Sequence, residues 1–151
     1  MLLQLQESES SVLISTFFIG ETLWGIDTLR VQEVIRVSDV TPVRHAAPSV
    51  AGVINLRGKI VTIVDLGKKL ALPQATSAAE TRIIIVEWNN EYVGLLVDRV
   101  SDVVNAEISQ IAPAPSNVQG VQGSFLEGVL RTRESLISIL GIDKILADAD
   151  G

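Results

Sequence analysis

Short apolar runs rich in β-branched residues, separated by Gly, Asn and Pro, follow one another along most of the chain. Runs of this length predict strands, and Asn89-Asn90 between two of them is typical of a hairpin turn. Many short strands favour a barrel or a sandwich. Strands are predicted over residues 12–19, 23–26, 34–37, 59–64, 83–86, 92–97, 100–104, 126–130 and 136–140, and short helices over 28–32, 66–72 and 142–149.

The chain contains an internal repeat. Residues 52–64 align without a gap with residues 128–140, and residues 25–34 align with residues 94–103 in the same order. A chance match between apolar β sequences could explain one block, but two ordered blocks favour duplication. Each half would then be a small barrel of about five strands, too small to bury much core alone. We therefore expect the halves to pack together and to leave a binding groove between them.

The repeat and the turn residues also predict how the chain is divided. Small, polar residues between the two halves are typical of a linker, and the N-terminal residues are polar. Strands can still cross from one half to the other barrel. The predicted division is a tail over 1–11, a first barrel over 12–72, a linker over 73–81, a second barrel over 82–146 and a tail over 147–151.

Composition narrows the chemistry that the chain can perform. It has no cysteine and one histidine, His45, which excludes disulfides, a thiol nucleophile and a three-histidine zinc site. No glycine-rich phosphate loop or convincing carboxylate pair stands out. A net charge of −6 without a basic stripe argues against nucleic acid as a partner. No apolar run approaches the roughly 20 residues of a membrane helix. We expect a cytoplasmic, non-enzymatic protein without cofactor, metal or membrane insertion.

The segment Asn55-Leu56-Arg57-Gly58 lies between two predicted strands and is typical of a tight turn. Gly58 can adopt a positive φ, and the Asn55 side chain can bond nearby backbone. Arg57 at the tip can present five N–H donors to a carboxylate or to carbonyl groups. Two interpretations are open: Arg57 bonds its own barrel as part of a structural turn, or it binds a partner.

The helix predicted after the second strand is the other informative segment. Asp27 or Thr28 can cap it. Leu29 or Val31 on this helix can pack inward or toward the groove, and Glu33 lies at its end. The alternative is that the aliphatic side chains belong to the core and the charges face solvent.

Together, residues 25–34 and 52–66 resemble the CheW family of chemotaxis coupling proteins. Family members carry Gly-Ile-Asp leading into Val-Gln-Glu-Val, followed by a stretch that contains Asn-Leu-Arg-Gly, as this chain does. Further matches, which extend the resemblance over nearly the whole chain, lie at 93–98, 100–103 and 111–115.

The resemblance implies a mainly β fold of two tandem SH3-like five-stranded β-barrels with short helices. It implies a scaffold that couples the cytoplasmic tip of a chemoreceptor to the regulatory domain of the histidine kinase CheA, without catalysis of its own. The family's receptor and kinase contacts fall at Val31, Gln32, Glu33, Val34, Asn55, Leu56, Arg57 and Gly58.

The chain departs from the family pattern around its Pro-x-Pro sequence. Family members can carry a basic residue before this sequence and an aromatic residue after it, in the region with which the second barrel closes rings with the kinase. Ala112 and Asn117 occupy these positions here. We therefore expect a second-barrel contact that is weak or made by other side chains.

Two further classes of function are open. The same fold could serve a related pathway, such as pilus-based or gliding motility, or act as a regulatory module normally fused to another domain. A small-ligand binder or an enzyme is the more distant alternative.

Overall fold

The computed structural model describes residues 10–73, 79–118 and 120–147. Within these ranges the chain is mainly β with short helices, as predicted. No helix in the described ranges is long and apolar enough to cross a membrane. Most of the two expected tails and the middle of the expected linker lie outside the described residues, at 1–9, 148–151 and 74–78.

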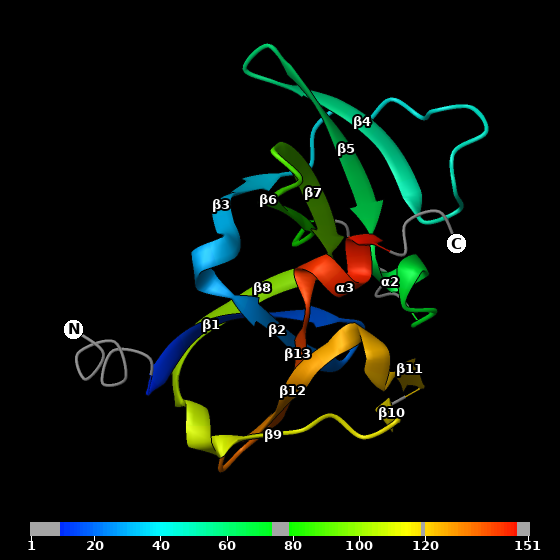
Figure 1. The fold of residues 1–151 in the computed structure, drawn as a ribbon. Coiled ribbons are helices and arrows are strands. Elements are labelled where there is room, and N and C mark those ends of the chain that lie inside the picture. The colour runs from blue at the N-terminus through cyan, green and yellow to red at the C-terminus, as the bar shows by residue number, and fades with distance from the viewer. Residues whose placement is uncertain (1–9, 74–78, 119, 148–151) are drawn as a thin grey trace.

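The strands form two main curved sheets that pack against each other (Figure 1). We call the five-stranded sheet, in the order β3-β6-β7-β5-β4, the first barrel. The six-stranded sheet, in the order β8-β1-β2-β13-β12-β9, is the second barrel. The first barrel consists of β3 (Val31–Arg36), β4 (Val50–Leu56), β5 (Lys59–Asp65), β6 (Arg82–Trp88) and β7 (Glu91–Val97).

The second barrel has one strand more than predicted. The sixth strand is β9, a two-residue strand that follows a helical turn and pairs with β12. A separate two-stranded sheet of β10 (Asn117–Val118) and β11 (Val121–Gln122) lies between β9 and β12 in the sequence. The second barrel consists of β1 (Ser11–Ile19), β2 (Thr22–Asp27), β8 (Arg99–Glu107), β9 (Ile111–Ala112), β12 (Leu126–Arg131) and β13 (Leu136–Leu140).

The helices are single turns or little more. α2 follows β5, and α3 follows β13, at the equivalent place in the repeat. The predicted helix over 28–32 is shorter in the structure, because Val31 and Gln32 already belong to a strand. The helices are η1 (Thr28–Arg30), α2 (Leu66–Lys69), η2 (Ile108–Gln110), η3 (Gly123–Phe125) and α3 (Ile142–Ala147).

The allocation of strands to barrels differs from the predicted division into 12–72 and 82–146. The hairpin β1–β2 of the first half pairs with β8 and β13 of the second half. The hairpin β6–β7 of the second half pairs with β3 and β5 of the first. The two halves therefore exchange their first hairpins. A sequence repeat shows which strands are equivalent, but it does not show which copy of a hairpin joins which sheet.

Strand register supports the duplication. Gly94 pairs with Ile63 across parallel strands in the first barrel, and Gly25 pairs with Ile139 at the equivalent place in the second. The same isoleucines also pair with equivalent glycines in the antiparallel direction, Ile63 with Gly52 of β4 and Ile139 with Gly128 of β12. In both cases the register shifts next to this glycine. The two aligned sequence blocks thus occupy matching positions in the two sheets.

The largest apolar core lies between the barrels. It includes Phe17, Trp24, Val86, Leu95 and Ile145, all of which are fully buried. Each barrel also has a smaller core of its own. The core between the barrels is therefore filled with side chains from both halves.

Candidate functional site

The turn between β4 and β5 has the predicted tight geometry. The ladder ends at the pair of Leu56 and Lys59, which leaves a two-residue loop. Both loop residues have positive φ, 51° at Arg57 and 87° at Gly58, as in a type I′ hairpin. The backbone N–H of Gly58 donates to Asn55 Oδ1 at 2.8 Å. This bond holds the turn and leaves the arginine at the tip.

Gln32, Glu33 and Val34 lie on β3, an edge strand of the first barrel. The strand was predicted from Val34 onward, whereas Gln32 and Glu33 were expected in a helix and at its end. They belong to the strand because the segment pairs with β6. Side chains alternate along the strand, so that Gln32 and Val34 are exposed while Glu33 is half-buried. Leu29, expected to pack inward or toward the groove, is 85% exposed.

An ion pair brings the two predicted segments together. The Arg57 guanidinium contacts both carboxylate oxygens of Glu33, with Nη1 at 3.4 Å from Oε1 and Nη2 closer to Oε2. Since β3 and β4 are the two edges of one sheet, this contact bridges the edges of the first barrel. The hydrogen bond to Glu33, assisted by its negative charge, raises the pKa of Arg57. The arginine therefore stays charged at neutral pH.

The eight predicted site residues divide into anchors and exposed groups. Leu56 packs against the core of the first barrel, and Val31 packs against the core between the barrels. Asn55, Arg57 and Gly58 are exposed at the hairpin tip. The edge of β3 and the hairpin tip thus form one continuous surface, which we call the Glu33–Arg57 surface.

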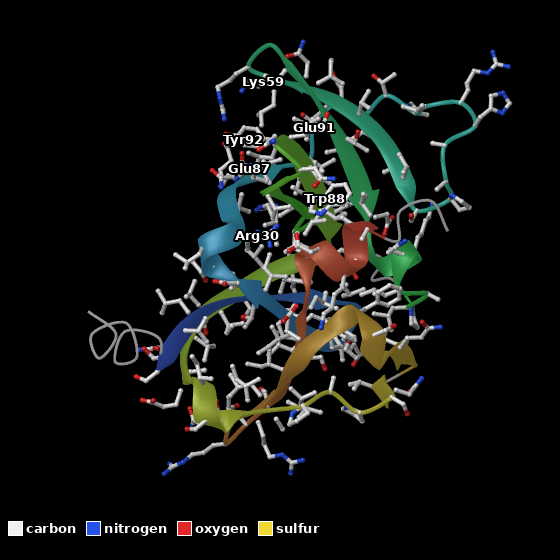
Figure 2. All side chains as sticks on the ribbon, in the orientation of Figure 1. Arg30, Lys59, Glu87, Trp88, Glu91 and Tyr92 are labelled. Atoms are coloured by element: carbon white, nitrogen blue, oxygen red, sulfur yellow. The ribbon has the colours of Figure 1, made fainter. Side chains whose placement is uncertain are left out.

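Ile60 extends this surface and was not among the predicted residues. Its exposed fraction is 67%, and it lines a hollow of about 360 Å³ together with Lys59 and Tyr92. Figure 2 shows Lys59 beside Tyr92, and the Lys59 ammonium lies 5.2 Å from the ring centroid. The sequence already indicated that an aliphatic residue is exposed here. Ile60 and Val61 are adjacent in a strand, so only one of them can face the core.

The other residues singled out in the sequence lie apart from this surface. His45 is exposed in the loop between β3 and β4. Ala112 is exposed on β9 of the second barrel, and Asn117 is exposed on β10 of the separate two-stranded sheet. Among the described residues, no group of three or more His, Asp or Glu side chains is placed to hold a metal ion.

Two barrels that exchange hairpins across a packed junction, with a strand edge joined to a hairpin tip, define a two-barrel module that presents an outer contact surface. A family model described as a CheW-like domain matches residues 14–150. The chain belongs to this CheW-like family.

Relatives agree with this assignment. The chain is 35% identical to the chemotaxis protein CheW of Thermotoga maritima, covering 89% of this chain and 87% of that protein. It is 34% identical to the chemotaxis protein CheW of Klebsiella aerogenes, covering 89% and 81%. The solved structure of the scaffolding protein TtCheW from Thermoanaerobacter tengcongensis matches with a TM-score of 0.82 at 33% identity, covering 87% and 84%. These matches confirm the predicted SH3-like two-barrel fold.

Proposed function

We propose that this protein is a chemotaxis adaptor that holds a CheA-type histidine kinase against the cytoplasmic tip of a chemoreceptor. The relatives named above are chemotaxis and scaffolding proteins. The observation that carries the proposal is the Glu33–Arg57 contact, because it joins the two segments with the family's binding motifs into one surface. The adaptor acts in the cytoplasm and performs no catalysis of its own.

The receptor contact is assigned to the edge of β3 and its surroundings. Val34 and Leu29 are exposed aliphatic residues there, with exposed fractions of 46% and 85%. η1 lies against β1 through a 2.7 Å hydrogen bond between Thr28 and Ser15, and Ser15 pairs with Val103, which is also exposed. Aliphatic side chains from both barrels thus border η1. Such a surface suits the apolar face of a helix, and a receptor tip is helical.

The kinase contact is assigned to the end of the first barrel. Gly58 leaves backbone exposed at the hairpin tip. The aliphatic side chain of Ile60 is exposed next to Tyr92. A barrel of the kinase regulatory domain can cover this region by apolar packing. An exposed aliphatic residue near an aromatic and a charged arginine is typical of the centre of a protein interface.

Coupling follows from the adjacency of the two contacts. A partner that favours one arrangement of the assembly changes kinase output by its differential affinity for that arrangement. Single contacts of this kind are often small and weak. An array that combines many of them gains avidity.

The test is reconstitution of a receptor fragment, a CheA-type kinase and this protein, with autophosphorylation as the readout. We expect receptor control of the kinase to require the adaptor and to be lost with Arg57→Ala. The proposal fails for this receptor and kinase if control is the same with and without the adaptor and no pairwise binding occurs at high micromolar concentration.

A further inference from the structure

The two barrels differ at the place where their parallel strands run side by side. In the first barrel, β5 and β7 form four successive pairs, from Thr62–Val93 to Asp65–Leu96. In the second barrel, β13 and β2 form only the first two equivalent pairs, Ser138–Trp24 and Ile139–Gly25. Beyond them the strands part. The contact between the two parallel strands is therefore fully closed in the first barrel and only partly closed in the second.

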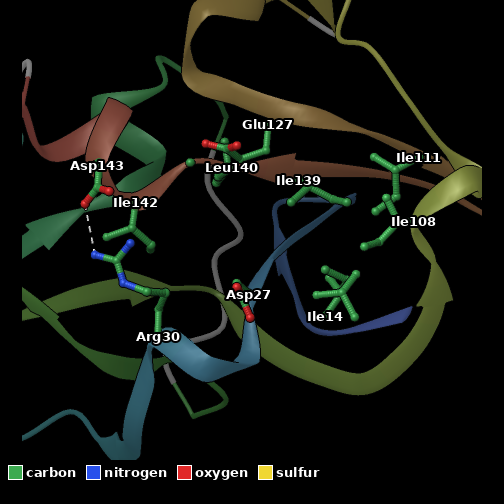
Figure 3. A pocket seen from close by; sticks show the side chains of 12 residues that line it. Ile14, Asp27, Arg30, Ile108, Ile111, Glu127, Ile139, Leu140, Ile142 and Asp143 are labelled. Carbon is green, nitrogen blue, oxygen red and sulfur yellow. Dashed lines mark hydrogen bonds and ion pairs between the residues drawn. The ribbon is translucent and has the colours of Figure 1, made fainter. Parts of the chain in front are cut away.

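A hollow of about 430 Å³ lies where β2 and β13 part (Figure 3). Asp27 and Gly141, which line it, occupy the positions that Leu96 and Asp65 hold in the closed barrel. A pocket of this volume falls within the range of about 300–1,000 Å³ that is usual for binding sites. Its apolar wall is formed by Val12, Ile14, Ile108, Ile111 and Ile139.

The rim of this hollow is acidic. Its lining residues include three carboxylates, on Asp27, Glu127 and Asp143, and one cation, Arg30. Two of these carboxylates have a cation beside them: Arg30 Nη2 lies 3.0 Å from Asp143 Oδ1, and Lys144 Nζ lies 3.6 Å from Glu127 Oε1. Both ion pairs are partly exposed, and one carboxylate remains in excess at the rim. An apolar wall below an acidic rim favours a ligand that carries an aliphatic group flanked by positive charge.

We propose that this hollow docks a basic, apolar peptide segment of a partner protein, with an aliphatic side chain in the pocket and lysine or arginine at the rim. The hollow opens between two strands that have stopped pairing, so an extended segment can lie along the opening. None of the eight residues predicted from the family motifs lines it. The site is therefore separate from the Glu33–Arg57 surface, and this proposal does not rest on the adaptor function.

The probe is the peptide acetyl-Lys-Lys-Leu-Ile-Lys-Lys-amide, titrated into the full chain and followed by NMR. We expect methyl shifts at Ile108, Ile111 and Ile139, and affinity that falls as salt screens the rim charges. An acidic peptide, with glutamate in place of each lysine, and a peptide with serines in place of Leu-Ile should bind at least about fivefold more weakly.

Two substitutions test the pocket directly. Ile108→Ser removes part of the apolar wall, and Glu127→Gln removes one rim charge; each should weaken the basic peptide about fivefold or more. Val43→Ser is the matched control for Ile108→Ser, because Val43 is equally exposed, at 46% against 47%, but lies in a loop of the first barrel. It should leave the affinity unchanged.

Three outcomes would overturn the proposal. The first is equal binding of the basic and acidic peptides, and the second is unchanged affinity in both pocket variants. In the third, concentrating the protein alone shifts the same methyl signals together with dimer formation, and the peptide does not compete. The occupant would then be a second copy of this chain.

Discussion

At the scale of single residues, two glycines on the parallel strands leave space for isoleucine side chains of the core. A Cβ atom at Gly94 would lie 2.5 Å from Ile63 Cδ1 and 2.6 Å from Ile83 Cγ2, and one at Gly25 would lie 2.4 Å from Ile14 Cγ2. These distances are far below ordinary contact. Glycine occupies the equivalent position in both halves of the repeat, because the space that a side chain would need is already occupied by core isoleucines.

We expect Gly94→Ala to destabilise the protein by about 1–3 kcal/mol, the usual cost of overpacking a core. Urea unfolding would measure this loss. Ile63→Val provides the matched control, because it removes the Cδ1 atom nearest to the added methyl group. The double variant should lose less stability than the sum of the two single variants. Strict additivity would show that the added methyl group does not meet Ile63.

Arg57→Ala should weaken binding to the kinase domain or the receptor tip about tenfold or more, as at an interface hot spot. The melting temperature should change little, because the Arg57 side chain is exposed and exposed ion pairs contribute little to folding. Affinity and melting temperature should be measured on the same samples. Arg57→Lys keeps the charge but loses the two-pronged contact with Glu33, so it separates charge from geometry. A lower melting temperature with unchanged affinity would instead assign Arg57 to the turn alone.

The same pair has a defined pH dependence. The hydrogen bond to Glu33 and its negative charge raise the pKa of Arg57 above its ordinary value. A raised pKa contributes stability below the unfolded value, and this contribution is lost only as pH rises through the folded value. We therefore expect no loss of binding between pH 6 and about 9 from titration of Arg57. A midpoint in that window that disappears in Arg57→Ala would contradict this assignment.

At the scale of elements, the hairpin β4–β5 carries four exposed residues of the candidate site, Asn55, Arg57, Gly58 and Ile60. Ile60→Ser should weaken kinase binding about tenfold without loss of folding, because this side chain contributes little buried area. Val43→Ser, in the neighbouring loop, is the control for the loss of an exposed aliphatic group. Calorimetric titration with the isolated regulatory domain would decide the matter. Equal affinity of the two variants would remove the end of the first barrel from the kinase contact.

The sequence predicted most strands to within a few residues, because apolar runs bounded by turn residues specify strand positions well. It was less successful around Val31, where Val-Gln-Glu-Val suits either a helix end or an edge strand; pairing with β6 makes it a strand. The short elements between β8 and β12 were not predicted, since segments of two or three residues carry no periodicity. They are η2, β9, β10, β11 and η3. The ion pair of Glu33 with Arg57 was not predicted either. It depends on two sheet edges meeting in space.

At the scale of the whole molecule, the central fact is that the halves exchange hairpins. Residues of both halves contribute to each sheet and to the core between the barrels. The repeat in the sequence revealed the duplication but not the exchange, because equivalent hairpins present the same apolar pattern to either sheet. The partial closure of the second barrel also escaped sequence analysis, since it appears only when the registers of the two sheets are compared.

The exchange makes a prediction about cutting the chain between the halves. A fragment of residues 1–78 would keep β3, β4 and β5 but lose β6, which lies between β3 and the rest of its sheet. Residues 79–151 would likewise lose β1 and β2, which connect β8 to β13. Neither fragment can complete a sheet or bury the central core, so each alone should give a poorly dispersed NMR spectrum and no cooperative melt. Mixed in equal amounts, the fragments should associate and recover the spectrum of the intact chain. A cooperative melt of either fragment alone would show that a half can fold with its own hairpin, and that the exchanged pairing is not required for stability.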